Sequence, residues 1–187
     1  WPHQNNSGGF FFALMKKSPE AIRSTPKMPG VMKRRELTAE DARHLKQVMS
    51  YYDFPSEIFK SFSFFSASRG IMIVDQNHHV PEKVLLDACG QLFLKTQMRH
   101  PKITTTAALT WAPWARAHVV HVNERQRVAY MNREDQVINP NQVIGADPGS
   151  MVLVRYEKFG LGCGYLILKE NQWVLQSLFP KSMRPGA

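Results

Sequence analysis

The chain has 187 residues, of which 43% are hydrophobic, so it is long enough to bury a core and too apolar to be wholly disordered. It carries 24 Lys and Arg residues against 15 Asp and Glu residues, and the net charge of +9 indicates a polyanionic partner such as RNA or DNA. A solvated basic surface without such a partner is the alternative explanation of this charge.

The sequence carries no signal for a membrane or for secretion. No run of about 18 uncharged apolar residues is present, which excludes a membrane-spanning helix, and no secretory pattern is recognisable. The cysteines, Cys89 and Cys163, are far apart and form no Cys-x-x-Cys pair, which argues against a zinc site and against a disulfide framework. We therefore expect an intracellular protein with no membrane partner.

The first residues predict one buried strand and a linker. The apolar run at 10–15 lies between a polar turn at 4–9 and a pair of lysines, which is typical of a buried strand. A buried strand needs neighbours, so we expect it to complete the sheet of a larger protein. Residues 18–36 contain several prolines among short polar residues and are predicted to form a linker.

The middle of the chain predicts alternating helices and strands. A helix is predicted at 40–52, because Thr38 can cap it, Asp41 stands in the capping-box position and apolar residues recur at helical spacing. A second helix is predicted at 81–88 and one or two helical turns at 132–144. The hydrophobic patterns predict strands at 59–65, 71–74, 92–95, 107–111, 119–122 and 127–131.

The C-terminal residues predict a small barrel or sandwich. Strands are predicted at 151–156, 165–168 and 173–179, joined by a glycine loop (Gly160, Gly162, Gly164) and a polar turn. The glycines do not fit a nucleotide-binding fingerprint, because a strand rather than a helix is predicted to follow them. They either permit a turn or bulge with positive φ or let an RNA backbone approach closely.

Two stretches resemble the Sun-type RNA cytosine-5 methyltransferases, and in particular their tRNA-modifying branch. Residues 2–17 contain Pro-His, a polar turn with Gln and Asn, Gly-Gly-Phe-Phe, an apolar run and lysine, and they resemble the last strand of the catalytic domain. Residues 149–156, the glycine stretch at 160–164 and Leu-Phe-Pro-Lys at 178–181 resemble the PUA-type barrel that follows it. Residues 92–111 are similar to the segment before that barrel.

The resemblance implies an α+β fold, in which the terminal strand of a Rossmann-like methyltransferase sheet is followed by a mixed α/β region that ends in a PUA-like β-barrel. The implied divisions are a methyltransferase strand, a linker, an α+β pre-barrel region and the barrel, at 1–17, 18–36, 37–144 and 145–187. The implied function is the RNA-binding C-terminal region of an S-adenosylmethionine-dependent tRNA (cytosine-5) methyltransferase, which docks structured RNA for the catalytic domain.

The resemblance also implies which chemistry belongs to the rest of such an enzyme. In the family, one cysteine attacks C6 of cytosine and a second assists release, and they lie in Pro-Cys and Thr-Cys motifs. Neither motif occurs here, so we expect no catalytic residue, cofactor-binding residue or metal site in this chain, and S-adenosylmethionine only in the parent enzyme. We expect RNA, in particular tRNA, as the partner of a monomer in the nucleus or nucleolus of a eukaryote, or otherwise in the cytoplasm.

Basic and aromatic side chains are the predicted RNA contacts. The basic set consists of Lys158, Lys181 and Arg184, with Arg155 behind them, and of Lys95, Arg99 and Lys102 beside a groove. A solvated face is the alternative for the second group. The aromatic residues that either stack on unpaired bases or form the core are Trp111, Trp114, Tyr165, Trp173 and Phe179.

Two other functions remain as alternatives. One is a self-sufficient enzyme with His118 or His121 as its base, although the spacing offers neither residue a Ser, Cys or carboxylate partner. These histidines are predicted to face opposite sides of a strand, which does not suit one metal ion. The other alternative is a basic protein-interaction module without an RNA-binding role, which would meet an acidic partner.

Overall fold

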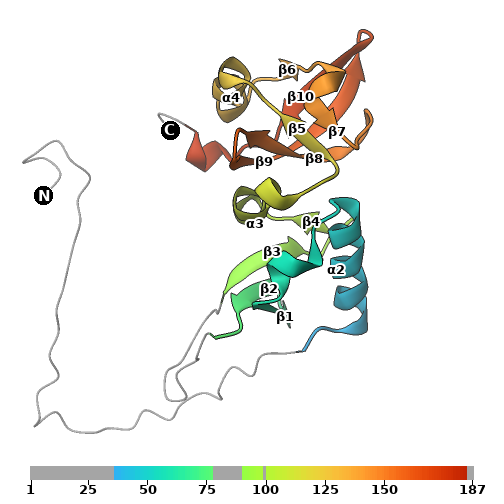
Figure 1. Ribbon diagram of the computed structural model, residues 1–187, viewed down its shortest axis with the longest axis vertical. Coiled ribbons are helices and arrows are strands. Elements are labelled where there is room, and N and C mark those ends of the chain that lie inside the picture. Colours follow the sequence, from blue (N-terminus) through green and yellow to red (C-terminus); the bar gives the residue numbers. More distant parts are fainter. Residues whose placement is uncertain (1–35, 78–89, 99, 185–187) are drawn as a thin grey trace, which may run out of the picture. The chain divides into compact units, whose positions relative to one another are not determined.

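The computed structural model describes residues 36–77, 90–98 and 100–184 (Figure 1). The chain divides into two units, Trp1–Val31 and Met32–Ala187, and the first lies wholly outside the described residues. The strand predicted at 10–15, most of the predicted linker, the helix predicted at 81–88 and Arg99 lie outside them as well. The Rossmann-like strand therefore stays a prediction.

The helix α2 (Ala39–Tyr51) begins where the sequence predicts it. The Thr38 Oγ1 accepts a hydrogen bond from the Asp41 N–H at 3.1 Å, as expected of a helix cap. The Asp41 carboxylate does not return to Thr38 directly. Instead Ser66 accepts from the Thr38 N–H at 3.1 Å and donates to the Asp41 carboxylate, so a distant strand completes the cap.

A four-stranded antiparallel sheet follows α2, with the order β1-β2-β3-β4. Its strands are β1 (Phe62–Ala67), β2 (Gly70–Asp75), β3 (Gln91–Lys95) and β4 (Lys102–Ile103). The strands predicted at 71–74 and 92–95 are confirmed. The strand predicted at 59–65 starts only at Phe62, because Ser56–Phe59 forms a 3-10 turn, η1, after Pro55.

A bulge in β3 directs Phe93 into the core. Met72 pairs with Leu92 and Ile71 pairs with Leu94, so Phe93 is the extra residue on its strand. Its side chain is fully buried, and its ring lies 5.8 Å from that of Phe59 and 5.4 Å from that of Phe64. An aromatic cluster thus fills the space between this sheet and its neighbours.

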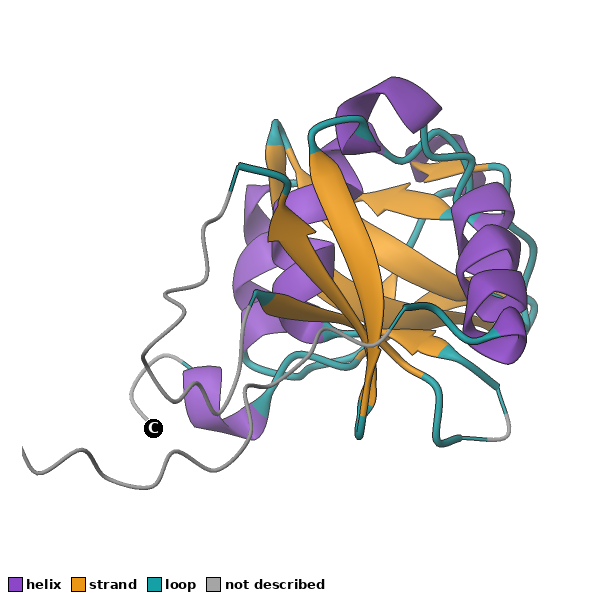
Figure 2. Cartoon of the chain, turned by 90° about the horizontal axis from the view of Figure 1, so that it is seen from below, coloured by secondary structure: helices purple, strands orange, loops and turns teal. Residues whose placement is uncertain are grey.

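The C-terminal part of the chain forms a six-stranded curled sheet with the order β6-β10-β9-β8-β5-β7. Figure 2 shows the strands of both sheets in orange, with helices beside them. Its strands are β5 (Val119–His121), β6 (Gln136–Val137), β7 (Val143–Ile144), β8 (Met151–Tyr156), β9 (Phe159–Lys169) and β10 (Gln172–Ser177). Only β5 and β8 pair in parallel. The α+β class is confirmed for the described residues, and β5, β6 and β7 join the sheet although they precede the barrel boundary predicted at residue 145.

The strand predicted at 107–111 is wrong, because these residues belong to the helix α3 (Thr105–Trp111). Thr104 caps it by accepting a hydrogen bond from the Ala107 N–H at 3.1 Å. Ala107 and Ala108 have no exposed surface, and α3 packs between β3 and β9 (Figure 1). The 3-10 turn η2 (Ala112–Trp114) continues the helix.

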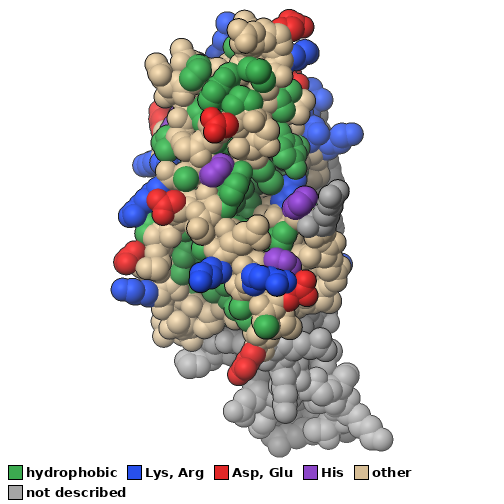
Figure 3. Space-filling view, turned by 90° about the vertical axis from the view of Figure 1, so that its right-hand side faces the viewer, with side chains coloured by type: hydrophobic (Ala, Val, Ile, Leu, Met, Phe, Trp, Pro, Cys, Tyr) green, Lys and Arg blue, Asp and Glu red, His purple; other side chains and the backbone are tan. Residues whose placement is uncertain are grey.

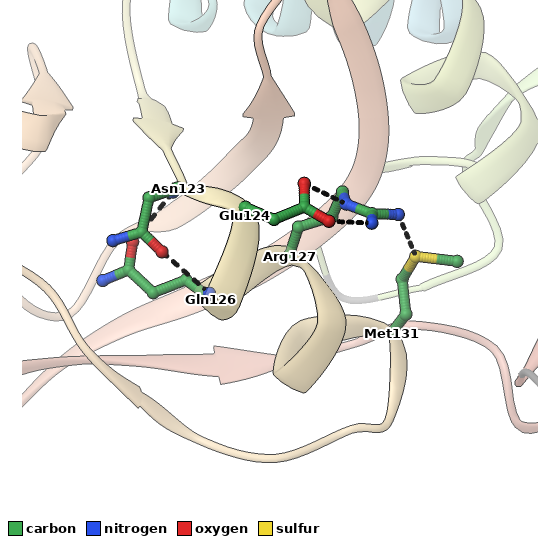
Figure 4. A network of polar contacts seen from close by, with 5 residues as sticks. All are labelled: Asn123, Glu124, Gln126, Arg127 and Met131. Atoms are coloured by element: carbon green, nitrogen blue, oxygen red, sulfur yellow. Dashed lines mark hydrogen bonds and ion pairs between the residues drawn. The ribbon is translucent and has the colours of Figure 1, made fainter.

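The strand predicted at 127–131 is also wrong. These residues belong to the helix α4 (Glu124–Met131), which Asn123 and Gln126 start with a reciprocal capping box (Figure 4). The helical turns predicted at 132–144 shrink to one 3-10 turn, η3 (Pro140–Gln142), between the short strands β6 and β7. A last 3-10 turn, η4 (Lys181–Met183), follows β10.

The predicted glycine loop does not exist, because all three glycines lie inside β9. A Cβ on Gly160 would stand 2.5 Å from the Ala108 carbonyl oxygen, and one on Gly162 would stand 2.7 Å from the Tyr130 hydroxyl. Gly162 has a φ of +135°, and the pairing with β8 shifts register beside it, so the bulge interpretation is confirmed. Protein atoms fill the space at these glycines, which rules out an approach of RNA backbone there.

Candidate nucleic-acid interface

The structure brings two of the predicted basic residues together. Lys95 and Lys102 are directly opposite each other in the β3–β4 pair. Both line a cavity of about 400 Å³ whose other walls include Thr104 and Thr106. The Thr104 hydroxyl already donates to the Leu92 carbonyl at 2.6 Å, so the two ammonium groups and the Thr106 hydroxyl are the donors that make this edge of the four-stranded sheet suitable for phosphate.

The other predicted basic residues lie on different elements. Lys158 is exposed in the β8–β9 turn, with its Nζ 5.5 Å from the centre of the Phe159 ring. Lys181 and Arg184 are exposed at η4. Arg155 is half-buried on β8, where burial lowers the pKa of its guanidinium and its Nε has no hydrogen-bond partner among the described residues.

A second cavity, of about 420 Å³, lies between α2, β4 and the strands β8 and β9. We call it the Tyr165 pocket. Its lining is largely apolar and includes Lys102 and His100 but no Asp or Glu. On the face shown in Figure 3, hydrophobic side chains gather in the upper half, with Lys, Arg and His side chains below and beside them.

Tyr51 forms a fixed wall of the Tyr165 pocket. Its ring stacks on His118 with 3.7 Å between ring centres, and its hydroxyl donates to the Met151 carbonyl at 3.0 Å. His118 in turn places its Nδ1 2.7 Å from the Tyr51 carbonyl oxygen, from a backbone with a φ of +54°. Burial raises the pKa of Tyr51, so its hydroxyl stays protonated at neutral pH and acts as a donor.

Tyr165 and Lys102 form the polar and aromatic end of the same pocket. Tyr165 lies on β9, paired with Met151 on one side and Gln176 on the other, and 39% of its surface is exposed. The Lys102 Nζ lies 5.7 Å from the centre of the Tyr165 ring. Among the described residues Lys102 forms no ion pair with a carboxylate, and its ammonium group lies against the Tyr165 ring instead.

On α4, in contrast to Lys102, the basic side chain Arg127 is paired with a residue of its own helix. Arg127 forms an ion pair with Glu124 (Figure 4). Its guanidinium carbon also lies 5.2 Å from the centre of the Tyr156 ring. Its Nη1 also donates to the Met131 sulfur at 3.8 Å. Because its charge is already neutralised, Arg127 is a weaker candidate for a phosphate contact than Lys102.

The predicted aromatic set divides between core and surface. Trp111 and Phe179 are buried, Trp173 is half-buried, and Trp114 and Tyr165 are exposed. Trp114 exposes 53% of its surface at η2 and lines neither of the two cavities described above. Tyr165 is therefore the predicted stacking residue that the structure places beside a basic side chain and a cavity.

Cys163 and His121, the side chains considered for catalysis, have surroundings that suit a packing role better. Cys163 is buried, and burial raises the pKa of its thiol to about 12, so it is not a nucleophile at neutral pH. Burial and the nearby Arg155 lower the pKa of His121. Within 36–77, 90–98 and 100–184, no group of three or more His, Cys, Asp and Glu residues is arranged to hold a metal ion.

The Cys163 thiol is expected to resist modification in the folded protein. In a Cys89→Ser variant, which leaves Cys163 as the one thiol, an aromatic disulfide reagent at pH 8 should react at least tenfold faster in denaturant than in buffer, because the buried thiol stays protonated. Absorbance of the released thiolate measures both rates. Equal rates would show that Cys163 is accessible and would contradict its packing role.

The described helices include none that is long and apolar enough to cross a membrane.

Comparison with known proteins finds one kind of similarity, to solved structures. No family model matches the sequence, and the search of curated proteins finds no relative. Among solved structures, the fold is similar to that of a conserved PUA domain protein from Thermoplasma acidophilum, with 11% sequence identity and a TM-score of 0.49, over 81% of this chain and 97% of that one.

Proposed function

We propose that this chain is the RNA-binding C-terminal region of an S-adenosylmethionine-dependent tRNA (cytosine-5) methyltransferase and that it docks structured RNA for the catalytic domain. The observation that carries the RNA-binding part is the Lys95–Lys102 pair next to the exposed ring of Tyr165. Cations beside an exposed aromatic ring are the side chains with which proteins bind phosphates and unpaired bases.

The charge of the whole chain supports the same partner. A net charge of +9 attracts a polyanion over a distance of about 10 Å or less at physiological salt. The curled six-stranded sheet is an architecture suited to the PUA-like barrel of the proposal. Binding energy gained on this surface would serve catalysis by holding the target cytosine in place at a remote active site.

The methyltransferase part rests on the sequence of residues 2–17, which resembles the last strand of the family's catalytic domain. Its test is methyl transfer from labelled S-adenosylmethionine to tRNA by the whole protein from which this chain comes. The expected product is 5-methylcytosine. Absence of that product, in a protein that still binds tRNA, would overturn the enzymatic part and leave the RNA-binding part standing.

Removal of the Lys95 and Lys102 charges tests the RNA-binding part. With the 187-residue chain and labelled tRNA, the Lys95→Ala and Lys102→Ala variants are expected to reduce the slope of log affinity against log salt by about one unit each, because each loses a phosphate contact. Fluorescence anisotropy across a salt series measures the slopes. Lys60→Ala, which changes an exposed lysine that lines neither cavity, is the matched control.

Two results would contradict this proposal. The first is an unchanged slope and affinity in both variants, which would show that Lys95 and Lys102 are solvated and do not contact RNA. The second is displacement of the bound tRNA by an acidic peptide of lower charge at the same concentration, which would favour a protein partner instead.

A further inference from the structure

We infer that the Tyr165 pocket receives a single unpaired nucleotide of the bound RNA, with its base stacked on Tyr165 and its phosphate at Lys102. This inference rests on the proposed function, because it specifies which part of an RNA the surface selects.

The size and lining of the pocket fit a nucleotide. Its volume of about 420 Å³ lies within the range of roughly 300–1,000 Å³ that is typical of small-molecule sites. Val48, Ile103 and Met151 supply apolar walls, and no carboxylate is present in the lining to repel a phosphate. A flat apolar group with an attached negative charge therefore matches the cavity better than a purely apolar or a cationic ligand.

The two tyrosine rings that line the pocket, Tyr51 and Tyr165, differ in whether a base can stack on them. The Tyr51 ring is stacked on His118, and its hydroxyl is bound to Met151, so it forms a wall. Tyr165 has 39% of its residue surface exposed, and the Lys102 Nζ lies 5.7 Å from the centre of its ring. Tyr165 is thus the ring on which a base can stack, while Lys102 already stands within reach of the phosphate that would accompany it.

Polar groups in the same lining suit the edge of a base. Gln47 reaches the pocket from the exposed surface of α2, and its amide can both donate and accept hydrogen bonds. His100 adds a further ring nitrogen beside Lys102. A mixture of one donor–acceptor amide and one imidazole is able to pair with the Watson–Crick edge of an unstacked base.

The pocket predicts a preference among RNAs of equal charge. A base inside a duplex is stacked above and below and paired at its edge, so it cannot reach a cavity that lies between α2, β4, β8 and β9. A bulged nucleotide can leave the helix without breaking a pair. The unaltered chain should therefore distinguish a bulged duplex from a blunt one with the same number of phosphates.

The test uses the 187-residue chain and two duplexes with equal numbers of phosphates, one blunt and one with a single bulged 2-aminopurine. The bulged RNA is expected to bind about tenfold more tightly, in line with the stacking of one base on an aromatic side chain. Its 2-aminopurine fluorescence should fall on binding. Tyr165→Ala should abolish both effects, and Tyr165→Phe should preserve them.

A control variant and a measurement on the unaltered protein complete the design. Leu168→Ala changes another exposed side chain of β9 that is absent from the pocket, so it should leave the preference unchanged. Photocrosslinking of a bulged 5-bromouridine to the unaltered chain should label a peptide from the pocket. This measurement decides the question even if Tyr165→Ala fails to fold.

The outcomes separate this inference from the proposed function. Equal binding of both duplexes, or a crosslink elsewhere, would overturn the pocket while RNA binding stands. Failure to bind either duplex or tRNA would overturn both. Binding of free adenosine monophosphate as tightly as the bulged RNA would overturn RNA as the source of the nucleotide.

Discussion

Replacement of Phe93 by alanine is expected to lower the free energy of unfolding by about 3–5 kcal/mol. The side chain is fully buried, and it contacts Phe59 and Phe64 at the centre of the aromatic cluster. Phe93 is the extra residue of the β3 bulge, and its truncation would leave a cavity among these rings in the closely packed core. The loss is large against the 5–15 kcal/mol by which a typical domain is stable.

Chemical denaturation of the 187-residue chain measures this effect, with Phe159→Ala as the matched control. Phe159 undergoes the same chemical change, but 54% of its surface is exposed, so the expected cost is below about 1 kcal/mol. Equal costs for the two substitutions would contradict the central position of Phe93.

Replacement of Gly160 by alanine is expected to lower the free energy of unfolding by about 3 kcal/mol. The added Cβ would stand 2.5 Å from the Ala108 carbonyl oxygen and 2.8 Å from that of Leu109. Both atoms belong to the backbone of α3, so the clash can be relieved only by moving the helix away from β9. If the clashing atoms belonged to a flexible side chain, that side chain could move aside and the loss of stability would be much smaller.

Gly149→Ala provides the control for Gly160→Ala, because it isolates the cost of backbone conformation. Gly149 has a φ of +98°, yet no heavy atom lies within 4 Å of its hypothetical Cβ. Its substitution should cost only about 1–2 kcal/mol, from an unfavourable φ alone. A Gly160→Ala variant that melts at the wild-type temperature would show that α3 does not pack on β9 as described.

The sequence predicts elements well where a local signal is complete. Thr38 and the periodic apolar residues after it predict α2. The short apolar runs of β2, β3 and β10 and the alternating residues of β8 predict strands. At 127–131 the sequence also contains a helix signal, since Asn123 and Gln126 have the spacing of a capping box. At 107–111 a local helix signal also exists, since Thr104 can cap the helix and Ala107, Ala108 and Leu109 are strong helix formers.

The candidate site is harder to predict because its parts are distant in sequence. Lys95 and Lys102 were predicted to flank a groove, and they are neighbours across β3 and β4. The stacking of Tyr51 on His118 joins residues 67 positions apart, and no pattern within one sequence indicates such a contact. The approach of Lys102 to Tyr165 likewise depends on how the two sheets pack, which is a property of the folded chain.

The place of β6 at the edge of the six-stranded sheet has a consequence for synthesis on the ribosome. In the described sheet β6 pairs with β10 alone, and β5 pairs with β8. Both β5 and β6 are therefore synthesised before the strands with which they pair. A nascent chain that ends before Gln172 cannot close this sheet, and its unpaired apolar strands remain open to chaperones or to aggregation. Termination of synthesis before Gln172 should therefore be as harmful to this sheet as a break in its middle.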